Sequence, residues 1–379
     1  MNFLPWTGHQ RAIGAALGAP DRVEREPERL VTLDRDACTR RLILATTIAV
    51  VAGALAYGVP RTSGPSDFAQ VWAAARGWRQ GLDPYTIVGP HRPFEWPFPL
   101  LYPLTAVIAG LPFSWMPLPL ADACFVAVGA WVLVWALTRG SVYSPTLWAF
   151  VSLSFLYVIQ TSQWSTLITA SVLLPALAPL WICKPTIGAA LLAAYPRRST
   201  LIAGLVCLLA SVALYPSWIR EWMAGLSSAP HVAPLVRATF AGPLVLLSLV
   251  RWRRPEARLL AALVCVPQTP LLYEAIPVFL VARKHWEGIA LAALTVVAWS
   301  WWVASPSASY DQLMAASGRA MVWCVYLPAT LFVLRRPNVW NDEPPRVQAL
   351  VLDNAGALSA AAAPSAMTGL RLNSRTTRS

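Results

Sequence analysis

One aspartate is placed where a carboxylate could do acid–base chemistry. Asp67 follows the apolar run 42–60 by only a few residues. A carboxylate at a membrane surface can be partly desolvated, and desolvation raises its pKa toward the value that a general base needs. The same position also suits a solvated loop aspartate or the N-cap of a helix over residues 68–80. The position of Asp67 therefore leaves a catalytic and a structural interpretation open.

Three polar side chains stand inside otherwise apolar runs, namely Gln163, Lys184 and Glu274. Polar groups in such runs cost free energy unless they are paired or face a cavity, and they often serve a function. Gln163 and Glu274 could line a polar pocket or bridge two helices. Lys184 could bind an anionic group, or its long side chain could extend to the membrane surface.

The segment 61–99 is one of the few polar stretches of the chain. Asp83 and the Pro-Tyr pair that ends at Tyr85 suit a turn with an aromatic anchor at the membrane surface, and the alternative is a direct contact with a substrate. Trp96 is one of the loop tryptophans that could stack on a sugar ring, whereas most of the other tryptophans lie near span ends and suit an interfacial aromatic belt.

Three further cationic residues lie in polar segments and are either surface residues or anion ligands. Two are adjacent in the proline-rich part of the first loop, and the third precedes an apolar run in a second polar segment. They are His91, Arg92 and Arg237.

The elements that position these side chains must be helices in a membrane. The chain has 379 residues, of which 56% are hydrophobic and only 13% are charged, whereas soluble domains carry about 25% charged residues. The apolar runs are too long for the alternation of a β-barrel, and helices satisfy the backbone within lipid. The net charge of +12 comes from arginines clustered between apolar runs, which indicates membrane orientation rather than nucleic-acid binding. The composition predicts a polytopic, all-α integral membrane protein.

The cysteines indicate neither a metal site nor a disulfide framework. The six cysteines are dispersed, and no CxxC or Cys/His ligand spacing occurs. No Asp-x-Asp pattern stands out either. We expect no required metal and no cofactor.

The apolar runs predict a helical bundle of about ten to twelve spans, of which some must be broken or re-entrant because several runs are shorter than the roughly 20 residues that a span requires. Alternating crossings place four arginine-rich clusters on the cytoplasmic side, with Arg139 as a single exception outside. The same count places Gln163 near the cytoplasmic side, opposite Asp67, and that conflict stays open. The runs are 42–60, 100–115, 118–137, 143–158, 164–182, 185–195, 201–215, 240–250, 257–269, 271–282, 289–305 and 320–334.

Three regions follow from this pattern. Residues 1–41 form a polar, arginine-rich segment that places the N-terminus in the cytoplasm. Residues 42–334 form the membrane domain, with the loop 61–99 on the outer face. Residues 335–379 have the composition of a disordered cytoplasmic tail.

The first loop also carries a recognisable order of residues. The pattern "DF…W.AA…G.DPY", followed by "WPFPL", resembles the polyprenyl-phosphate-sugar-dependent glycosyltransferases of family 87, in the glycosyltransferase C superfamily. Gln163 in "TSQWSTLI" is similar to the family's Gly-Gln-x-Asn, Lys184-Pro185 to its Lys-Pro, and Pro267–Glu274 to its late Pro…Tyr-Asp. The chain has Ser162 where a Gly is usual, Glu274 where an Asp is usual, and "WPFPL" where Tyr-Pro-Pro is usual.

The resemblance implies a glycosyltransferase in the cell membrane with its active site on the outer face. The donor would be a polyprenyl-phosphate sugar, with mannose first and arabinofuranose second, and the acceptor a lipid-linked glycan or glycolipid of the cell envelope. Asp67 inherits the role of catalytic base. Displacement at the anomeric carbon needs no general acid when the leaving group is a phosphate, so cations must hold that phosphate. The candidates for this are Lys184, His91, Arg92 and Arg237.

Two other functions stay open at this stage. A transporter or lipid flippase would be expected to show internal repeats and charges at the middle of the bilayer, and neither is evident. A catalytically silent homologue that scaffolds an envelope complex would keep the fold and tolerate substitution of Asp67.

Overall fold

The computed structural model describes most of the chain between residues 26 and 338, with side chains from residue 35 onward. Residues 1–25 and 339–379, to which most of the two predicted terminal segments belong, lie outside the described residues. The chain divides into two units, 1–40 and 41–379, and all of the predicted site residues belong to the second. The described ranges are 26–58, 65–228, 232–238, 240–267 and 271–338.

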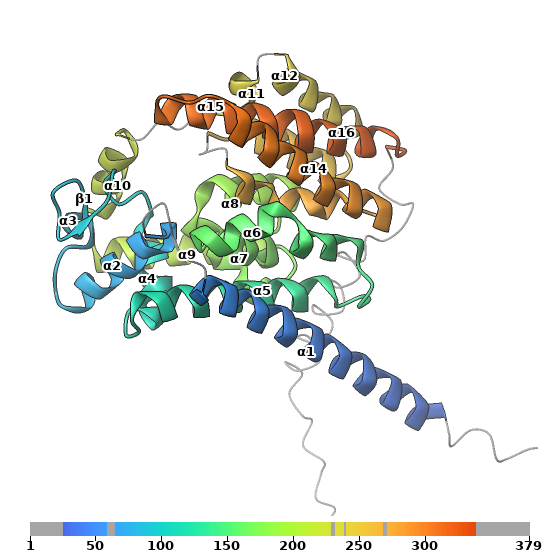
Figure 1. Cartoon of the computed structure of the whole chain (residues 1–379). Coiled ribbons are helices and arrows are strands. Elements are labelled where there is room, and N and C mark those ends of the chain that lie inside the picture. Colours follow the sequence, from blue (N-terminus) through green and yellow to red (C-terminus); the bar gives the residue numbers. More distant parts are fainter. Residues whose placement is uncertain (1–25, 59–64, 229–231, 239, 268–270, 339–379) are drawn as a thin grey trace, which may run out of the picture. The chain divides into compact units, whose positions relative to one another are not determined.

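The described chain is almost entirely helical (Figure 1). Its only strands among the described residues are two residues long and pair in parallel, Val88 with Phe94 and Gly89 with Glu95. The elements up to the middle of the chain are α1 (Glu26–Gly58), α2 (Asp67–Arg79), α3 (Pro84–Ile87), β1 (Val88–Gly89), β2 (Phe94–Glu95), α4 (Leu104–Gly110), η1 (Leu111–Phe113), α5 (Leu118–Leu137), η2 (Pro145–Val151), α6 (Leu153–Thr161), α7 (Ser165–Ser171) and η3 (Pro175–Cys183).

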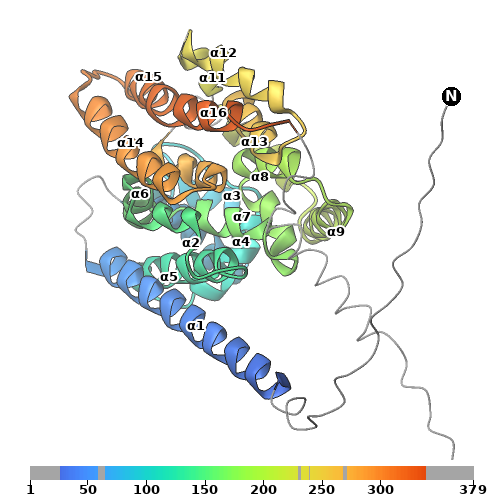
Figure 2. The same cartoon turned by 90° about the vertical axis from the view of Figure 1, so that its right-hand side faces the viewer.

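The second half of the chain continues the same architecture. Helices α14, α15 and α16 lie beside one another in both views of the ribbon (Figures 1 and 2). The elements are α8 (Pro185–Ala194), α9 (Arg198–Leu214), α10 (Trp218–Leu226), α11 (Pro234–Arg237), α12 (Ala241–Val245), η4 (Leu246–Arg251), α13 (Pro255–Cys265), η5 (Leu272–Val281), α14 (His285–Ala304), α15 (Tyr310–Met321), η6 (Val322–Tyr326) and α16 (Leu327–Leu334).

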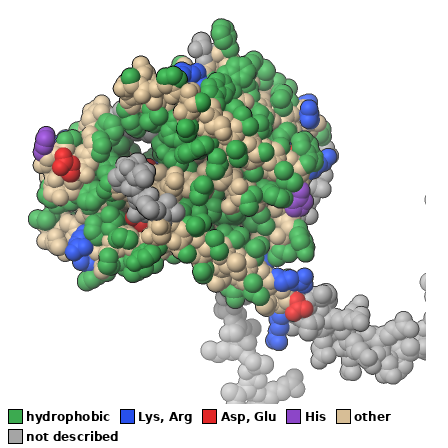
Figure 3. Space-filling model, viewed as in Figure 1, with side chains coloured by type: hydrophobic (Ala, Val, Ile, Leu, Met, Phe, Trp, Pro, Cys, Tyr) green, Lys and Arg blue, Asp and Glu red, His purple; other side chains and the backbone are tan. Residues whose placement is uncertain are grey.

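Several helices have the length and composition of membrane spans. Four described helices qualify, and a fifth span results if the pair α9 and α10, bent by 104°, is counted as one. Hydrophobic side chains dominate the face shown in Figure 3, and Lys and Arg appear on it only in small groups. The described residues therefore confirm the prediction of a helical chain, and their long apolar helices are compatible with a membrane protein. The four helices are Arg35–Gly58, Leu118–Leu137, His285–Ala304 and Tyr310–Leu334.

Many of the apolar runs form helices that are too short to be the ten to twelve predicted spans. The run 143–158 forms η2 and α6, and the run 164–182 forms α7 and most of η3. Proline explains part of this, because it begins η2, η3 and α8 and lies inside η3 at Pro179. Proline lacks the N–H that an α-helix interior needs, and it thereby breaks long helices into short ones.

The first span packs closely against α5, which runs beside it in the opposite direction. A Cβ atom added at Gly53 would lie 3.1 Å from the Cβ of Ala127. At the far end of α5, Arg41 donates a hydrogen bond to the carbonyl of Trp135 at 3.1 Å and places its guanidinium 4.2 Å from the centre of that indole ring. The close approach requires a small residue at position 53.

The same contact corrects the predicted side of Arg139. Arg41 also donates to the hydroxyl of Thr138 at 3.4 Å, so the end of α5 lies beside the start of the first span. The alternating count placed Arg139 on the opposite side because it treated residues 100–115 as a crossing. Those residues form only the short elements α4 and η1. Arg139 therefore lies at the same end as Arg41, and the exception to the predicted charge pattern disappears.

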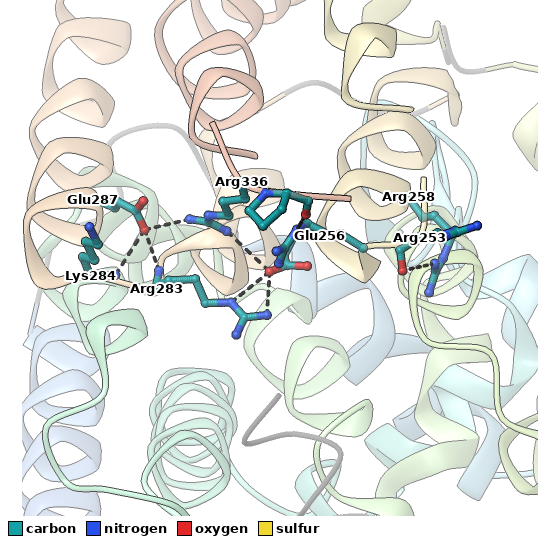
Figure 4. A network of polar contacts seen from close by, with 9 residues as sticks. Arg253, Glu256, Arg258, Arg283, Lys284, Glu287 and Arg336 are labelled. Atoms are coloured by element: carbon teal, nitrogen blue, oxygen red, sulfur yellow. Dashed lines mark hydrogen bonds and ion pairs between the residues drawn. The ribbon is translucent and has the colours of Figure 1, made fainter. Parts of the chain in front are cut away.

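Two glutamates join three segments into a buried ion network, which we call the Glu256 network (Figure 4). Glu256 is 1% exposed and accepts from Arg283 at 2.7 Å and from Arg336 at 3.4 Å. Arg336 also contacts Glu287 at 2.8 Å. Glu287 in turn accepts from the backbone N–H groups of Arg283 and Lys284.

Further arginines gather beside the Glu256 network. Arg258 donates to the carbonyl of Ala194 at 2.8 Å, and Arg251 to that of Leu334 at 3.1 Å. These contacts bring together the clusters that the charge pattern assigned to one side of the membrane. The structure therefore agrees with the prediction that these clusters lie on one side of the membrane. That this side is the cytoplasmic one stays a prediction.

Candidate active site

Four of the predicted residues form one continuous chain of polar contacts. The side-chain amide of Gln163 donates to Oδ2 of Asp67. The amide oxygen of Gln163 accepts from Nζ of Lys184 at 2.8 Å, and the same Nζ lies 3.0 Å from Oε1 of Glu274. A carboxylate, an amide, an ammonium group and a second carboxylate therefore follow one another in a fixed order, which we call the Asp67 cluster.

Asp67 is held at the first turn of α2. The hydroxyl of Ser66 accepts from the backbone N–H of Ala69 at 3.1 Å, which caps the helix just before Asp67. Phe68 stacks on Phe125 of α5 with ring centres 4.0 Å apart. A helix N-cap was the structural alternative to a catalytic role for Asp67. The N-cap is Ser66 instead, so the carboxyl of Asp67 is available to accept the hydrogen bond from Gln163.

Gln163 reaches Asp67 because the chain turns sharply between α6 and α7. Ser162 has a φ of +50°, in the left-handed region that non-glycine residues rarely adopt. Gln163 itself is 1% exposed. The alternating count of spans placed Gln163 and Asp67 on opposite sides of the membrane. Their hydrogen bond shows that this part of the count is wrong.

Lys184 enters the cluster from the junction of η3 and α8. Its side chain is only 12% exposed, and its Nζ lies against the buried side chains of Gln163 and Glu274. Nζ also lies 4.3 Å from the ring centre of Tyr273, a distance suited to a cation–π contact. A buried lysine with a carboxylate, an amide and an aromatic ring around it is well compensated.

Glu274 closes the other end of the cluster from η5. It is 1% exposed, and its Oε2 has no hydrogen-bond partner in the described part of the chain. Its neighbour Tyr273 stacks on Tyr157 with ring centres 5.8 Å apart and planes inclined by 7°. Buried carboxylate oxygens are normally hydrogen-bonded, so this oxygen is free to accept from a ligand.

The surroundings of Asp67 change its protonation. Burial raises the pKa of Asp67 above its ordinary value, while the charge of Lys184 and the hydrogen bond from Gln163 oppose that shift. Desolvation disfavours the carboxylate, and a nearby cation favours it. The balance gives an aspartate that binds a proton more readily than a solvated one, as a general base requires.

The remaining candidates of the first loop make other contacts. His91 and Arg92 are exposed, and His91 has a φ of +58° within a turn. Trp96 is half-buried and stacks on Phe94 with ring centres 6.3 Å apart. No contact joins these residues to the Asp67 cluster within the described residues, and their substrate roles stay predictions.

Asp83 and Tyr85 have structural contacts that explain the Asp-Pro-Tyr sequence. The carboxyl of Asp83 accepts from the backbone N–H of Tyr85 at 2.9 Å and thereby caps α3. The hydroxyl of Tyr85 lies 3.3 Å from the carbonyl of Tyr102. Arg237 ends α11, and its Nε has no hydrogen-bond partner among the residues that the structure describes. Substrate contacts of these three residues stay predictions.

Sequence reasoning missed one buried acid beside the Asp67 cluster. Asp122 in α5 is 0% exposed and accepts from the hydroxyl of Ser66 at 2.6 Å. It also missed Tyr102, Tyr157 and Tyr273, which lie close enough to Asp67 to sense its charge. Asp122 carried a signal, because it is an acid within an apolar run, as Glu274 is. The tyrosines carried none, since aromatic residues are common in membrane helices.

The cluster combines a carboxylate that can accept a proton with a cation that can bind an anion. Among the described residues no group of three or more His, Cys, Asp or Glu side chains is placed to hold a metal ion. No protein family, curated protein or solved structure matches this chain.

Proposed function

We propose that this protein is a membrane glycosyltransferase that moves a sugar from a polyprenyl-phosphate donor to a lipid-linked acceptor of the cell envelope. The observation that carries the proposal is the Asp67 cluster, in which one amide joins a proton-accepting carboxylate to a buried ammonium group. Sugar transfer from a lipid phosphate needs these two functions next to each other.

The reaction is a displacement at the anomeric carbon. The acceptor hydroxyl oxygen forms a bond to that carbon as its proton passes to the carboxylate of Asp67. The bond between the anomeric carbon and the phosphate oxygen breaks, and the polyprenyl phosphate leaves with the electron pair. Lys184 stabilises the charge of the leaving phosphate, for which it exchanges part of its contact with Glu274.

The ring faces around the cluster suit a sugar. Tyr157 and Tyr273 stack as a pair beside Lys184, and Tyr102 lies near Asp67. Aromatic rings with a polar group at one end offer both an apolar face and a hydrogen bond. We propose mannose as the first sugar and arabinofuranose as the second, with the site on the outer face of the cell membrane.

The test is sugar transfer in membranes that contain wild type or Asp67→Asn, supplied with labelled polyprenyl-phosphate-mannose and an envelope lipid extract. Asparagine has the same size and can still accept the hydrogen bond from Gln163, but it cannot take the proton. A positioned general base contributes about 10²–10⁴-fold to a rate, so transfer should fall by that factor. Asp36→Asn, at an exposed aspartate in the first unit, is the matched control.

Two results would count against the proposal. Transfer that survives Asp67→Asn at equal expression would assign the base to another residue, and Glu95 would be tested next. A wild type that transfers neither mannose nor arabinofuranose would favour a catalytically silent scaffold.

A further inference from the structure

One face of α5 contacts the residues that adjoin both partners of the Asp67–Gln163 hydrogen bond. Asp122 binds Ser66, which precedes Asp67, and Phe125 stacks on Phe68, which follows it. Residues 122 and 125 are three apart and therefore lie on one side of the helix. This side holds the start of α2 at two points.

The same face also holds the chain next to Gln163. Phe125 packs edge-on against Trp164 with ring centres 4.9 Å apart. One turn further, Gly129 lies so close to α7 that a Cβ atom there would be 2.5 Å from the Thr166 hydroxyl oxygen. Helix α5 thus sets the distance between α2, which begins at Asp67, and α7, which begins two residues after Gln163.

Asp122 is the polar part of this arrangement. The hydroxyl of Ser66 has one hydrogen, which it donates to Asp122 at 2.6 Å, and this leaves a lone pair for the N–H of Ala69 at 3.1 Å. The carboxylate therefore fixes the rotation of the hydroxyl that caps α2. An acid that is fully buried in a spanning helix is costly, and the cost indicates a function.

We propose that Asp122 is a positioning residue that orients the Ser66 cap and so holds the carboxyl of Asp67 against Gln163. The role of Asp67 as catalytic base rests on the proposed function, whereas the positioning of its side chain does not. An experiment on the Asp67 carboxyl itself can therefore separate the two.

The measurement is the labelling of Asp67 by dicyclohexylcarbodiimide in membranes, followed over pH by site-resolved mass spectrometry. This reagent reacts with protonated carboxyl groups in apolar surroundings. In Asp122→Ala the start of α2 loses its anchor and Asp67 becomes hydrated. Burial is the largest influence on the pKa of Asp67, so its loss outweighs the loss of the pKa-lowering hydrogen bond from Gln163. Labelling at neutral pH should therefore fall about tenfold for each unit by which the pKa drops. Asp122→Asn still accepts from Ser66 and should label Asp67 like wild type.

Ser66→Ala breaks the same hydrogen bond from the other side, and it carries the test if Asp122→Ala does not fold. Because both substitutions remove the same hydrogen bond, the double variant should label Asp67 no less than the stronger single variant does. Ser309→Ala removes the cap of α15 instead and serves as the capping control. Gel filtration and melting temperature check that each variant is folded.

Wild-type labelling of Asp67 in a folded Asp122→Ala variant would overturn the proposal, and so would single effects that simply add in the double variant. A wild type without sugar transfer, but with the expected labelling pattern, would reject the glycosyltransferase and retain the positioning role.

Discussion

The side-chain amide of Gln163 donates a hydrogen bond to the carboxylate of Asp67, although 96 positions separate the two residues in the chain. The other end of the same amide accepts from Lys184. The amide therefore transmits the charge of a buried cation to a carboxylate through two hydrogen bonds, and such bonds strengthen each other in a low dielectric. Predictions about activity and stability follow from this cluster, from the helices that hold it and from the Glu256 network.

Replacing Gln163 by Leu should move the acid limb of the transfer activity to higher pH. The hydrogen bond from Gln163 lowers the pKa of Asp67 against the effect of burial, so its loss lets the pKa rise further. The base must be deprotonated to act, and a carboxyl group with a higher pKa loses its proton only at higher pH. Initial rates between pH 5 and 9 measure the shift. Gln80→Leu, at an exposed glutamine, should leave the profile unchanged.

Replacing Lys184 by Gln should raise the KM for the donor more than that for the acceptor. A hydrogen bond to a charged group contributes about 1.5–3 kcal/mol, which corresponds to a rise of roughly 10- to 100-fold. Lys184→Arg keeps the charge and should be affected less. The other lysine of the chain, the exposed Lys284, provides the matched variant Lys284→Gln. Equal KM values for Lys184→Gln and Lys284→Gln would show that Lys184 does not hold the phosphate.

Replacing Glu274 by Ala should destabilise the protein, because Lys184 then keeps its charge without a carboxylate at 3.0 Å. Removing one partner of a buried ion pair costs about 3–5 kcal/mol. Thermal unfolding in detergent measures the loss. Glu95→Ala, at an exposed glutamate, is the control. The double variant Glu274→Ala with Lys184→Met should recover most of the stability, and a failure to recover would mean that the ion pair is not the cause.

Replacing Gly129 by Ala should also destabilise the protein. The new Cβ would lie 2.5 Å from the hydroxyl oxygen of Thr166, so α5 and α7 must move apart, and overpacking of this kind costs about 1–3 kcal/mol. Gly58→Ala is the matched control, since a Cβ atom added there would have no contact within 4 Å in the described part of the chain. Adding Thr166→Ala removes the clashing oxygen and should restore the melting temperature. A single variant that melts like wild type would contradict the close approach.

Glu256 and Arg336 should show an energetic coupling in a double-mutant cycle of Ala substitutions. Their side chains lie 3.4 Å apart, and Glu256 is buried. Residues that share an ion network couple by about 0.5–3 kcal/mol. The cycle is measured by unfolding in detergent, with Arg198, which is exposed, as the control partner for Glu256. A coupling as small as that between Glu256 and Arg198 would show that the Arg336 contact adds no stability.

The sequence predicted the members of the Asp67 cluster better than their arrangement. Gln163, Lys184 and Glu274 stood out because polar groups are expensive in apolar runs, and that argument depends only on composition. Their mutual contacts could not be predicted, because the turn at Ser162 and the breaks in the short helices are decided by tertiary packing. Asp122 satisfied the same criterion and was overlooked beside the more specific pattern of the loop.

The membrane topology was predicted in kind but not in detail. Long apolar runs such as the one that forms α5 are helices of spanning length. Shorter runs, such as residues 100–115, were counted as crossings although they form α4 and η1, and this error displaced Arg139 and Gln163 to the wrong sides. Hydropathy measures how apolar a run is, but it does not register the prolines that shorten its helix.

The contacts of Arg336 also determine where the chain can be cut or joined to another protein. Arg254 donates to the carbonyl of Pro337 at 2.6 Å, and Asn338 accepts from the backbone of Arg253 at 3.2 Å. A stop codon after Asn338 leaves these bonds and both carboxylate contacts of Arg336 in place. A stop codon after Leu334 deletes the guanidinium that joins the ends of α13 and α14. A reporter domain or purification tag therefore has to follow residue 338 if these contacts are to be kept.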